Sequence, residues 1–262
     1  MSAPPQRIVC LTAEAADWLW RLGAWDSVAG VTAYFEPPPG ARPKPRVSGF
    51  SSASVENILQ LNPDLVVAFS DIQAGIASRL ILRGCNVLTT NQRTLLEIEA
   101  ALALLARIVG CEAAGESLLR EFRKQLVPVP EPRRRPRVYF EEWNEPLVTG
   151  IAWVSELIER AGGEDVFASM RSRGRAPDRV VMPEQVMAAA PEFIFASWCG
   201  KPVSIEAIRR RPGWGQLPAV KHSHIYEIPG ADILQPGCGL VRGYEAIVRR
   251  LHSAGPIASS TL

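Results

Sequence analysis

Two stretches of the chain repeat almost the same order of polar and apolar residues. The first covers residues 54–71 (SVENILQLNPDLVVAFSD) and the second covers residues 182–198 (MPEQVMAAAPEFIFASW). They align without a gap, so that Glu56 falls on Glu184 and each copy has a proline at the same place. In both, a short amphipathic run ends at that proline and an almost wholly apolar run follows it. This order predicts a helix, a stop and a buried strand.

The apolar runs after the two prolines, Leu65–Phe69 and Phe193–Ala196, have no polar face. Strands of this kind suit the centre of a parallel sheet that helices cover on both sides. The repeat therefore predicts an α/β fold with two Rossmann-like lobes. Ligands of open parallel sheets bind beyond the carboxyl ends of the strands, here at 69–71 and 197–199. Pockets favour domain interfaces, so we expect the functional site in a cleft where the two lobes face each other.

The remaining pattern predicts an N-terminal α/β lobe at 1–93, a helical bridge between the lobes at 94–132 and a C-terminal α/β lobe at 133–262. Short apolar runs predict further strands at 8–11, 28–32, 86–89, 138–141 and 225–228. Amphipathic segments predict further helices starting at 12–14 and covering about 73–83, 153–161, 204–210 and 241–251. The prolines between residues 37 and 45 predict an irregular segment, and residues 143–150 are expected to form a loop.

The bridge has its own helix signals. Thr94 and Glu97 have the spacing of a capping box, which opens an apolar-striped helix. Helical character resumes after Gly110 and ends near Leu126, where three prolines follow. We therefore expect the lobes to be joined by a long helical segment, which limits hinge motion compared with a flexible crossover.

Composition and charge narrow the class of protein. The chain has 262 residues, of which 47% are hydrophobic and 21% are charged, as in ordinary globular proteins. Its net charge of +2 argues against a nucleic-acid partner. The only basic run, residues 133–137, is broken by a proline and is interpreted as a solvated linker. We expect a monomer.

Signals for metal binding or catalysis are weak. The five cysteines are scattered without a CxxC pair, and His222 and His224 have no acidic or thiol partner by spacing, so no metal site is predicted. Glu141 and Glu142 are adjacent on a predicted strand and should point to opposite faces, which does not suit paired acid/base work. No Ser/His/Asp order stands out, and no catalytic residue is assigned.

One glycine pattern resembles a cofactor-binding motif. The glycines at 237, 239 and 243 have the spacing GxGxxxG instead of a dinucleotide fingerprint, and they lie near the C-terminus. A first βαβ unit, where the fingerprint belongs, is at the other end of the chain. No cofactor is predicted.

Large aromatic side chains give a stronger lead. The aromatic residues fall just after predicted strands or in loops on the expected cleft side, where they suit a bulky, planar, partly apolar ligand. They are Tyr34, Phe50, Phe69, Trp143, Trp198 and Trp214. Glu56 and Glu184 begin the helices of the two repeat copies, and at matching places on two lobes they would suit a two-point grip on arginines of a symmetric partner.

The chain resembles the class III substrate-binding proteins of ABC importers, and among them those that bind vitamin B12. The resemblance runs over nearly the whole length. It is carried by RIVCLTAEAADWLWRLG, VAGVTAYFEPPP, ENILQLNPDLVVAF, NEPLVTG, AGGEDVF, PEQVMAAAPEFIF and GWGQLPAV followed by Asp232. It implies two rigid lobes joined by a long helix, with a corrinoid carried in the cleft as transported ligand and no enzyme activity. It also implies docking of Glu56 and Glu184 on the permease dimer, and cleft positions for Tyr34, Trp214 and Asp232.

The sequence departs from the vitamin B12 binders at four cleft positions. It has Phe50, Phe69 and Asp178 where those proteins carry tryptophan, and Leu147 in place of a phenylalanine. A ferric siderophore or haem therefore stays open as the ligand, and a cytosolic corrinoid carrier or enzyme of the same fold stays open as the function. The resemblance implies a periplasmic location, while the absence of a signal peptide before the first strand leaves a cytoplasmic one as the alternative.

Overall fold

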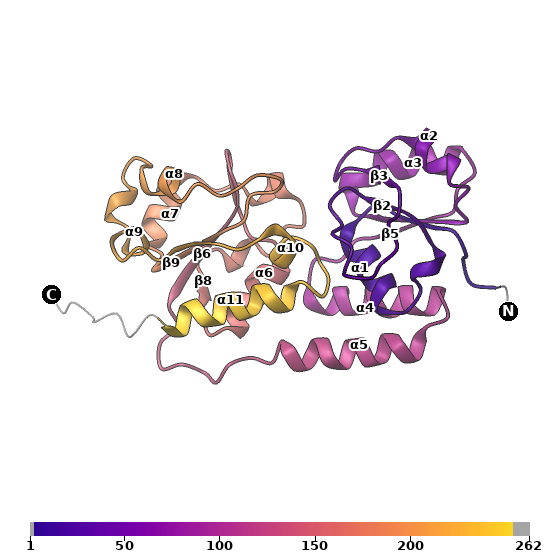
Figure 1. The fold of residues 1–262 in the computed structure, drawn as a ribbon. Helices are drawn as coiled ribbons and strands as arrows, with labels where there is room; N and C mark the ends of the chain where they lie inside the picture. The colour runs from indigo at the N-terminus through magenta and orange to yellow at the C-terminus, as the bar shows by residue number, and fades with distance from the viewer. Residues whose placement is uncertain (1–2, 254–262) are drawn as a thin grey trace. The chain divides into compact units, whose positions relative to one another are not determined.

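The computed structural model describes residues 3–253 (Figure 1). The chain divides into two compact units. Unit 1 contains the chain up to Lys124 together with Pro236–Cys238, and unit 2 contains Gln125–Gln235 and the chain from Gly239 onward. Each unit is an α/β layer structure, in agreement with the predicted fold class.

Unit 1 is built on a five-stranded parallel sheet with the order β3-β2-β1-β4-β5. The repeat strand β4 lies next to the first strand and is buried along its length, as its apolar sequence requires. The strands are β1 (Ile8–Cys10), β2 (Val28–Thr32), β3 (Arg46–Ser48), β4 (Leu65–Phe69) and β5 (Val87–Thr90). The α-helices are α1 (Ala13–Arg21), α2 (Val55–Gln60), α3 (Ala74–Leu82), α4 (Leu95–Ile108) and α5 (Glu112–Gln125), with 3-10 turns η1 (Trp25–Ser27) and η2 (Asp71–Gln73).

Unit 2 has a mixed sheet with the order β10-β9-β6-β7, in which β8 also pairs with β6. All pairings are parallel except that of β6 with β7. The strands are β6 (Arg137–Asn144), β7 (Leu147–Thr149), β8 (Glu164–Asp165), β9 (Phe193–Ala196) and β10 (Ile225–Glu227). The α-helices are α6 (Ala152–Arg160), α7 (Pro183–Ala189), α8 (Ile205–Arg209), α9 (Pro218–Lys221), α10 (Gly230–Ile233) and α11 (Leu240–Ser253), with 3-10 turns η3 (Ala168–Met170), η4 (Ala176–Arg179) and η5 (Trp214–Gln216).

The predicted repeat is confirmed as α2-β4 in unit 1 and α7-β9 in unit 2. The likeness extends to the backbone, because each helix is followed by a left-handed residue immediately before the proline. These residues are Asn62 (φ 46°) and Ala190 (φ 43°). A proline disfavours the right-handed helical conformation of the residue before it, so the left-handed residue ends the helix and redirects the chain into the strand.

The loop predicted for residues 143–150 is wrong. Strand β6 continues to Asn144 and β7 begins at Leu147, so this segment is an antiparallel hairpin with Glu145 and Pro146 at its turn. The proline is compatible with pairing here because it lies in the turn and is not required as a ladder donor. As a result, Trp143 belongs to a strand and not to a loop.

The helix signals of the predicted bridge are confirmed. The Thr94 hydroxyl accepts from the backbone N–H of Glu97 at 3.2 Å, and the Glu97 carboxylate accepts from that of Thr94 at 3.0 Å. These bonds satisfy free donors of the first turn of α4. Gly110, with φ 71°, separates α4 from α5, so the segment is two helices and not one long helix.

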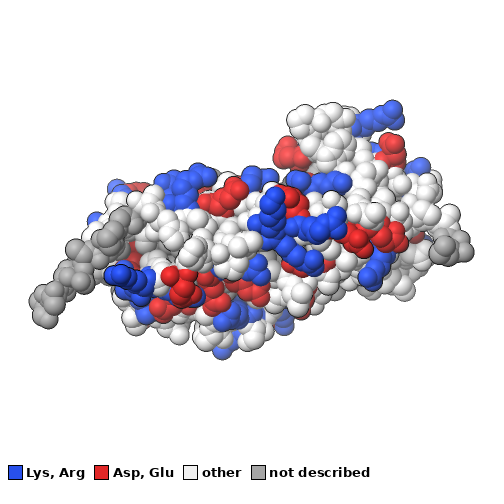
Figure 2. All heavy atoms as spheres, turned by 90° about the horizontal axis from the view of Figure 1, so that it is seen from below, with Lys and Arg blue, Asp and Glu red and all other residues white. Residues whose placement is uncertain are grey.

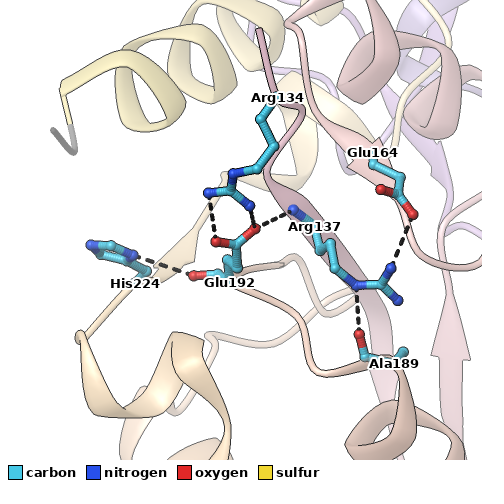
Figure 3. Close-up of polar contacts among 6 residues, drawn as sticks. All are labelled: Arg134, Arg137, Glu164, Ala189, Glu192 and His224. Carbon is cyan, nitrogen blue, oxygen red and sulfur yellow. Dashed lines mark hydrogen bonds and ion pairs between the residues drawn. The ribbon is translucent and has the colours of Figure 1, made fainter. Parts of the chain in front are cut away.

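The basic run at 133–137 is exposed or half-buried, as expected for a solvated linker, and several of its groups also pair with acidic residues. Arg134 makes two hydrogen bonds to the buried Glu192 carboxylate, at 2.6 and 2.9 Å, and the backbone N–H of Arg137 donates to it at 3.0 Å (Figure 3). Arg135 pairs with Glu131 at 2.7 Å. On the face seen in Figure 2, basic and acidic side chains likewise lie next to each other.

The GxGxxxG glycines have a packing role. A Cβ at Gly239 would overlap the carbonyl oxygen of Ala231, and one at Gly243 would overlap that of Asp232. These glycines therefore let the start of α11 approach α10 closely. A Cβ at Gly237 would lie 2.9 Å from the Cβ of Glu14 on α1.

Candidate functional site

The carboxyl edge of the unit 1 sheet is tied together by Gln73. Its side-chain amide donates to the carbonyl oxygens of Leu11, at 3.1 Å, and Phe50, at 2.9 Å, and its carbonyl oxygen accepts from the backbone N–H of Phe69 at 3.0 Å. Gln73 is buried, so the three bonds satisfy its polar atoms. One side chain thus fixes the segments that follow β1 and β3 against the end of β4. Gln73 is not among the site residues predicted from the sequence.

The three predicted aromatic residues of unit 1 follow different strands and differ in exposure. Tyr34 comes after β2 and is 50% exposed, and Phe50 comes after β3 and is 38% exposed. Phe69 ends β4 and is buried. The guanidinium of Arg93 lies 5.2 Å from the centre of its ring and also pairs with Asp71 at 2.9 Å. Of the three rings predicted at the strand ends of unit 1, two are therefore exposed and one is buried.

In unit 2, the buried Glu141 of β6, which pairs with the last residue of β9, is the centre of a polar cluster. Its carboxylate, with 0% side-chain exposure, accepts two bonds from Arg211 at 2.5 and 2.9 Å. It also accepts the indole N–H of Trp198 at 2.9 Å. The Arg211 guanidinium lies 4.5 Å from the ring centre of Trp214. The Glu141 carboxylate therefore positions Trp198 directly. It also positions Arg211, whose guanidinium lies close to the Trp214 ring.

The neighbouring Glu142 has a different partner, as the predicted opposite orientation of the two glutamates requires. It makes two hydrogen bonds to Arg179 at 2.7 and 3.0 Å, and Arg179 also donates to the carbonyl of Thr149. Arg179 is buried. Both adjacent carboxylates are thus compensated by arginines, which is how buried charges are tolerated.

Trp143 and Trp198 are brought together by Lys201. The Lys201 ammonium lies 4.1 Å from the ring centre of Trp143 and 5.1 Å from that of Trp198. The Trp143 indole N–H donates to the carbonyl of Glu145 at 2.8 Å, so hydrogen bonds fix both indoles. Lys201 was not singled out from the sequence, because nothing in its spacing relates it to the two tryptophans.

Trp214 and Asp232 are held by other groups of unit 2. Trp214 is 0% exposed in the hydrophobic core, where its ring packs edge-on against Tyr139 with the ring centres 6.2 Å apart. Asp232 lies on α10 and pairs with Arg242 of α11 at 2.6 Å. A ligand contact by either residue stays a prediction.

The two repeat glutamates are both exposed at the starts of their helices. Glu56 lies 4.0 Å from Arg83, and the side chains are 71% and 56% exposed. A pair this exposed contributes little to stability. Both carboxylates are therefore accessible to a partner, as the docking hypothesis requires.

The structure also contains a buried acid that is not among the predicted site residues. Glu14 in the first turn of α1 is buried, and burial raises its pKa from 4.5 to about 7, against hydrogen bonds from its own backbone N–H and from Thr12. Among the five cysteines, all of which fall in the described part of the chain, only Cys10 is buried. Within residues 3–253, no group of three or more His, Cys, Asp or Glu side chains is placed to hold a metal ion.

Comparison with known proteins identifies the family. The sequence profile of the family described as periplasmic binding protein matches residues 8–231. The chain belongs to the periplasmic binding protein family. This periplasmic binding protein is 28% identical over 245 residues to a vitamin B12-binding protein of Vibrio campbellii, with 90% of this chain and 85% of that protein covered.

Two solved structures of the family define the fold. The periplasmic vitamin B12 binding protein of Vibrio cholerae superposes with a TM-score of 0.73 at 24% identity, covering 96% of this chain and 98% of that chain. A periplasmic heme-binding protein from Roseiflexus sp. RS-1 superposes with a TM-score of 0.78 at 20% identity, covering 95% and 98%. The fold is that of the class III periplasmic binding proteins, and the role that the family shares is to carry a substrate. None of the helices within residues 3–253 is long and apolar enough to cross a bilayer.

Proposed function

We propose that this periplasmic binding protein captures cobalamin or a related corrinoid and delivers it to an ABC importer. The observation that supports this ligand is the similarity to vitamin B12-binding proteins over nine-tenths of the chain, 90% for the Vibrio campbellii protein. The residues at the carboxyl edges of the two sheets suit such a ligand. Exposed rings at Tyr34 and Phe50 and the partly buried indole of Trp143 provide flat apolar surface for a macrocycle, and the Trp198 ring, which is 6% exposed, lies under the same Lys201 ammonium as Trp143.

The remaining predicted contacts have supporting roles in this proposal. Phe69 adds apolar surface at the carboxyl edge of unit 1. Trp214 lies in the core of unit 2 and Asp232 lies on α10, and both are kept as predicted ligand contacts in this proposal. A ferric siderophore or haem is the second candidate ligand. It is favoured by the similar fold of the Roseiflexus heme-binding protein and by Phe50, Phe69 and Asp178 in place of tryptophan.

No chemical step is assigned to the protein. The adjacent carboxylates of Glu141 and Glu142 in unit 2 are each paired with an arginine and so are poorly suited to proton transfer. The corrinoid is a transported ligand in this proposal and not a cofactor.

The proposed partner is the permease dimer of the importer, with the protein acting as a monomer in the periplasm. Glu56 and Glu184 occupy equivalent positions in the two repeat copies and are exposed. Carboxylates form strong bidentate pairs with arginines, so one glutamate on each unit suits a partner with arginines on both of its halves.

A calorimetric titration of the purified protein tests the ligand. Cyanocobalamin and cobinamide are compared with haemin and a ferric hydroxamate under the same conditions. Saturable one-to-one corrinoid binding with a dissociation constant of about 1 μM or below, which corresponds to roughly −8 kcal/mol, supports the proposal. Binding of haemin or the hydroxamate without binding of either corrinoid contradicts it and favours the second candidate.

A further inference from the structure

The faces of Trp143 and Trp198 are already in contact with a cation of the same chain. The Lys201 ammonium lies 4.1 Å from the Trp143 ring centre and 5.1 Å from the Trp198 ring centre. A cation within about 6 Å of an aromatic ring centre is attracted by the electrons of the ring face. Any ligand ring that is to stack on these indoles needs the surface over which this ammonium now lies.

The local backbone is suited to holding Lys201 there. The backbone N–H of Lys201 donates to the carbonyl of Trp198 at 3.3 Å, and Gly200 between them has φ 77°. A left-handed residue at the third position of a four-residue turn is typical of a type II turn, which reverses the chain at low cost when that residue is glycine. The turn therefore returns Lys201 toward Trp198.

Both rings under the ammonium are anchored and the lysine is not. Trp198 donates its indole N–H to Glu141 and Trp143 donates its own to the carbonyl of Glu145. Lys201 is exposed, and in the described part of the chain its side chain has no carboxylate within ion-pair distance. Displacement of the ammonium into water therefore costs only the two ring contacts, whereas displacement of Trp198 would break a buried hydrogen bond and displacement of Trp143 an exposed one.

We propose that Lys201 is an internal competitor for a ligand subsite formed by Trp143 and Trp198. In the ligand-free protein its ammonium occupies the indole faces, and it leaves them when a planar ring of the ligand stacks there. Lys201 thereby lowers the affinity of the subsite for every ligand. It excludes small ligands whose stacking on the rings is weaker than the two cation–ring contacts that they would replace. This inference rests on the proposed function, because it assigns the self-occupied subsite to the transported ligand.

Two sets of measurements test this competition. In the first, the side-chain CH₂ resonances of Lys201 are recorded by ¹H–¹³C NMR in the ligand-free protein and assigned by their loss in Lys201→Ala. We expect an upfield ring-current shift relative to the exposed Lys221, loss of most of that shift in Trp143→Ala, and its disappearance when cyanocobalamin saturates the protein. An unshifted Lys201 in the ligand-free protein overturns the inference.

The second set compares the affinity of variants for cyanocobalamin. Lys201→Ala is expected to bind about threefold to tenfold more tightly, because ligand stacking no longer displaces two cation–π contacts. Lys201→Arg keeps a cation over the rings and is expected to bind within about twofold of the native protein. Lys221→Ala, at another exposed lysine of unit 2, is the matched control and should leave the affinity unchanged.

The outcomes separate this inference from the proposed function. Weaker or unchanged binding by Lys201→Ala, with the native protein binding the corrinoid, overturns the competition and leaves the proposed function standing; weaker binding would mean that the ammonium contacts the ligand. Failure of the native protein and of Lys201→Ala to bind any of the corrinoids overturns the proposed function, and the competition with it.

Discussion

The indole N–H of Trp198 donates to the buried carboxylate of Glu141 at 2.9 Å, and so connects a predicted ligand contact to the central strand of unit 2. The same carboxylate accepts two hydrogen bonds from Arg211. A carboxylate with 0% side-chain exposure is stable as an ion only because these donors replace its hydration. The position of Trp198 therefore depends on an ion pair that is not itself expected to touch the ligand.

Removal of this charge is expected to destabilise unit 2. Glu141→Gln leaves the largely buried Arg211 without its counter-ion, and the free energy of unfolding should fall by roughly 3 kcal/mol. Urea titration followed by tryptophan fluorescence measures the change.

Glu206→Gln is the matched control for this substitution. Glu206 pairs with Arg210 on the surface of α8 at 2.6 Å, and loss of this pair should change the unfolding free energy by less than about 0.5 kcal/mol. An equal effect of the two substitutions would contradict the role assigned to Glu141.

The stability of unit 1 should depend on the ionisation of Glu14. Its pKa is about 7 in the folded protein because of burial, compared with 4.5 ordinarily. The folded state therefore holds this proton more tightly than the unfolded state, and the associated contribution to stability is lost as the pH rises from about 4.5 to 7. The loss is at most about 3 kcal/mol, the equivalent of this pKa difference.

Glu14→Gln isolates this contribution from that of other acids. Glutamine cannot ionise, so the difference in unfolding free energy between the variant and the native protein should shift in favour of the variant as the pH rises from 4.5 to 8. Thermal unfolding followed by circular dichroism at several pH values measures it. A difference that does not vary with pH would show that Glu14 ionises as easily in the folded as in the unfolded protein.

The repeat and the periodic segments made most of the fold predictable. The segments at 54–71 and 182–198 form the expected helix and buried strand in both units, because a proline stop and a wholly apolar run are local signals. The hairpin at 143–150 was missed because its β7 strand has only three residues and a proline precedes it. The identities of the buried partners, such as Arg179 for Glu142, depend on long-range packing that periodicity does not encode.

The site was predictable to a smaller extent. Strand ends identified Trp143 and Trp198, but the third member of that group, Lys201, is related to them only by a turn and by side-chain contacts. Position after a turn suggested an accessible Trp214, whereas the ring lies in the core. A turn fixes where the chain reverses and not which side of it faces the interior, so burial of that tryptophan needed the tertiary structure.

The close approach of α10 and α11 should make Gly243 intolerant of a side chain. A Cβ in Gly243→Ala would overlap the carbonyl oxygen of Asp232, so the helices must move apart, and we expect a loss of roughly 2 kcal/mol or more of unfolding free energy. The matched control is Gly75→Ala in α3, where a Cβ meets nothing within 4 Å. That change should be neutral or should stabilise the protein by up to about 1 kcal/mol. Denaturant titration of both variants tests the packing role, which a stable Gly243→Ala protein would contradict.

The basic run offers a comparison of two neighbouring arginines. Arg134→Ala removes both hydrogen bonds to the Glu192 carboxylate, and the unfolding free energy should fall by about 1–2 kcal/mol because that carboxylate is buried. Arg133→Ala, at an exposed neighbour, should change it by less than about 0.5 kcal/mol.

The loss of unfolding free energy caused by Arg134→Ala should be smaller at acidic pH. Burial alone would raise the pKa of Glu192, but the hydrogen bonds from Arg134 and Arg137 outweigh it and lower the pKa below 4.5. The stabilisation is therefore present at neutral pH and is lost as the pH falls through the lowered pKa. Thermal unfolding of the two variants at neutral pH and near pH 3 measures both effects. The hypothesis of a freely solvated linker predicts instead that the two variants behave alike.

Simultaneous removal of the two repeat carboxylates should separate delivery from capture. The Glu56→Ala/Glu184→Ala protein is expected to lose its stimulation of the ATPase of the reconstituted permease, because the arginines of the partner would face uncharged surfaces. Its affinity for the ligand should be unchanged, since both side chains are exposed at helix starts and neither is among the residues proposed to bind the ligand. Glu206→Ala provides an exposed-glutamate control that should retain full stimulation. A large loss of ligand affinity in the double variant would place these glutamates in the binding site and contradict the docking assignment.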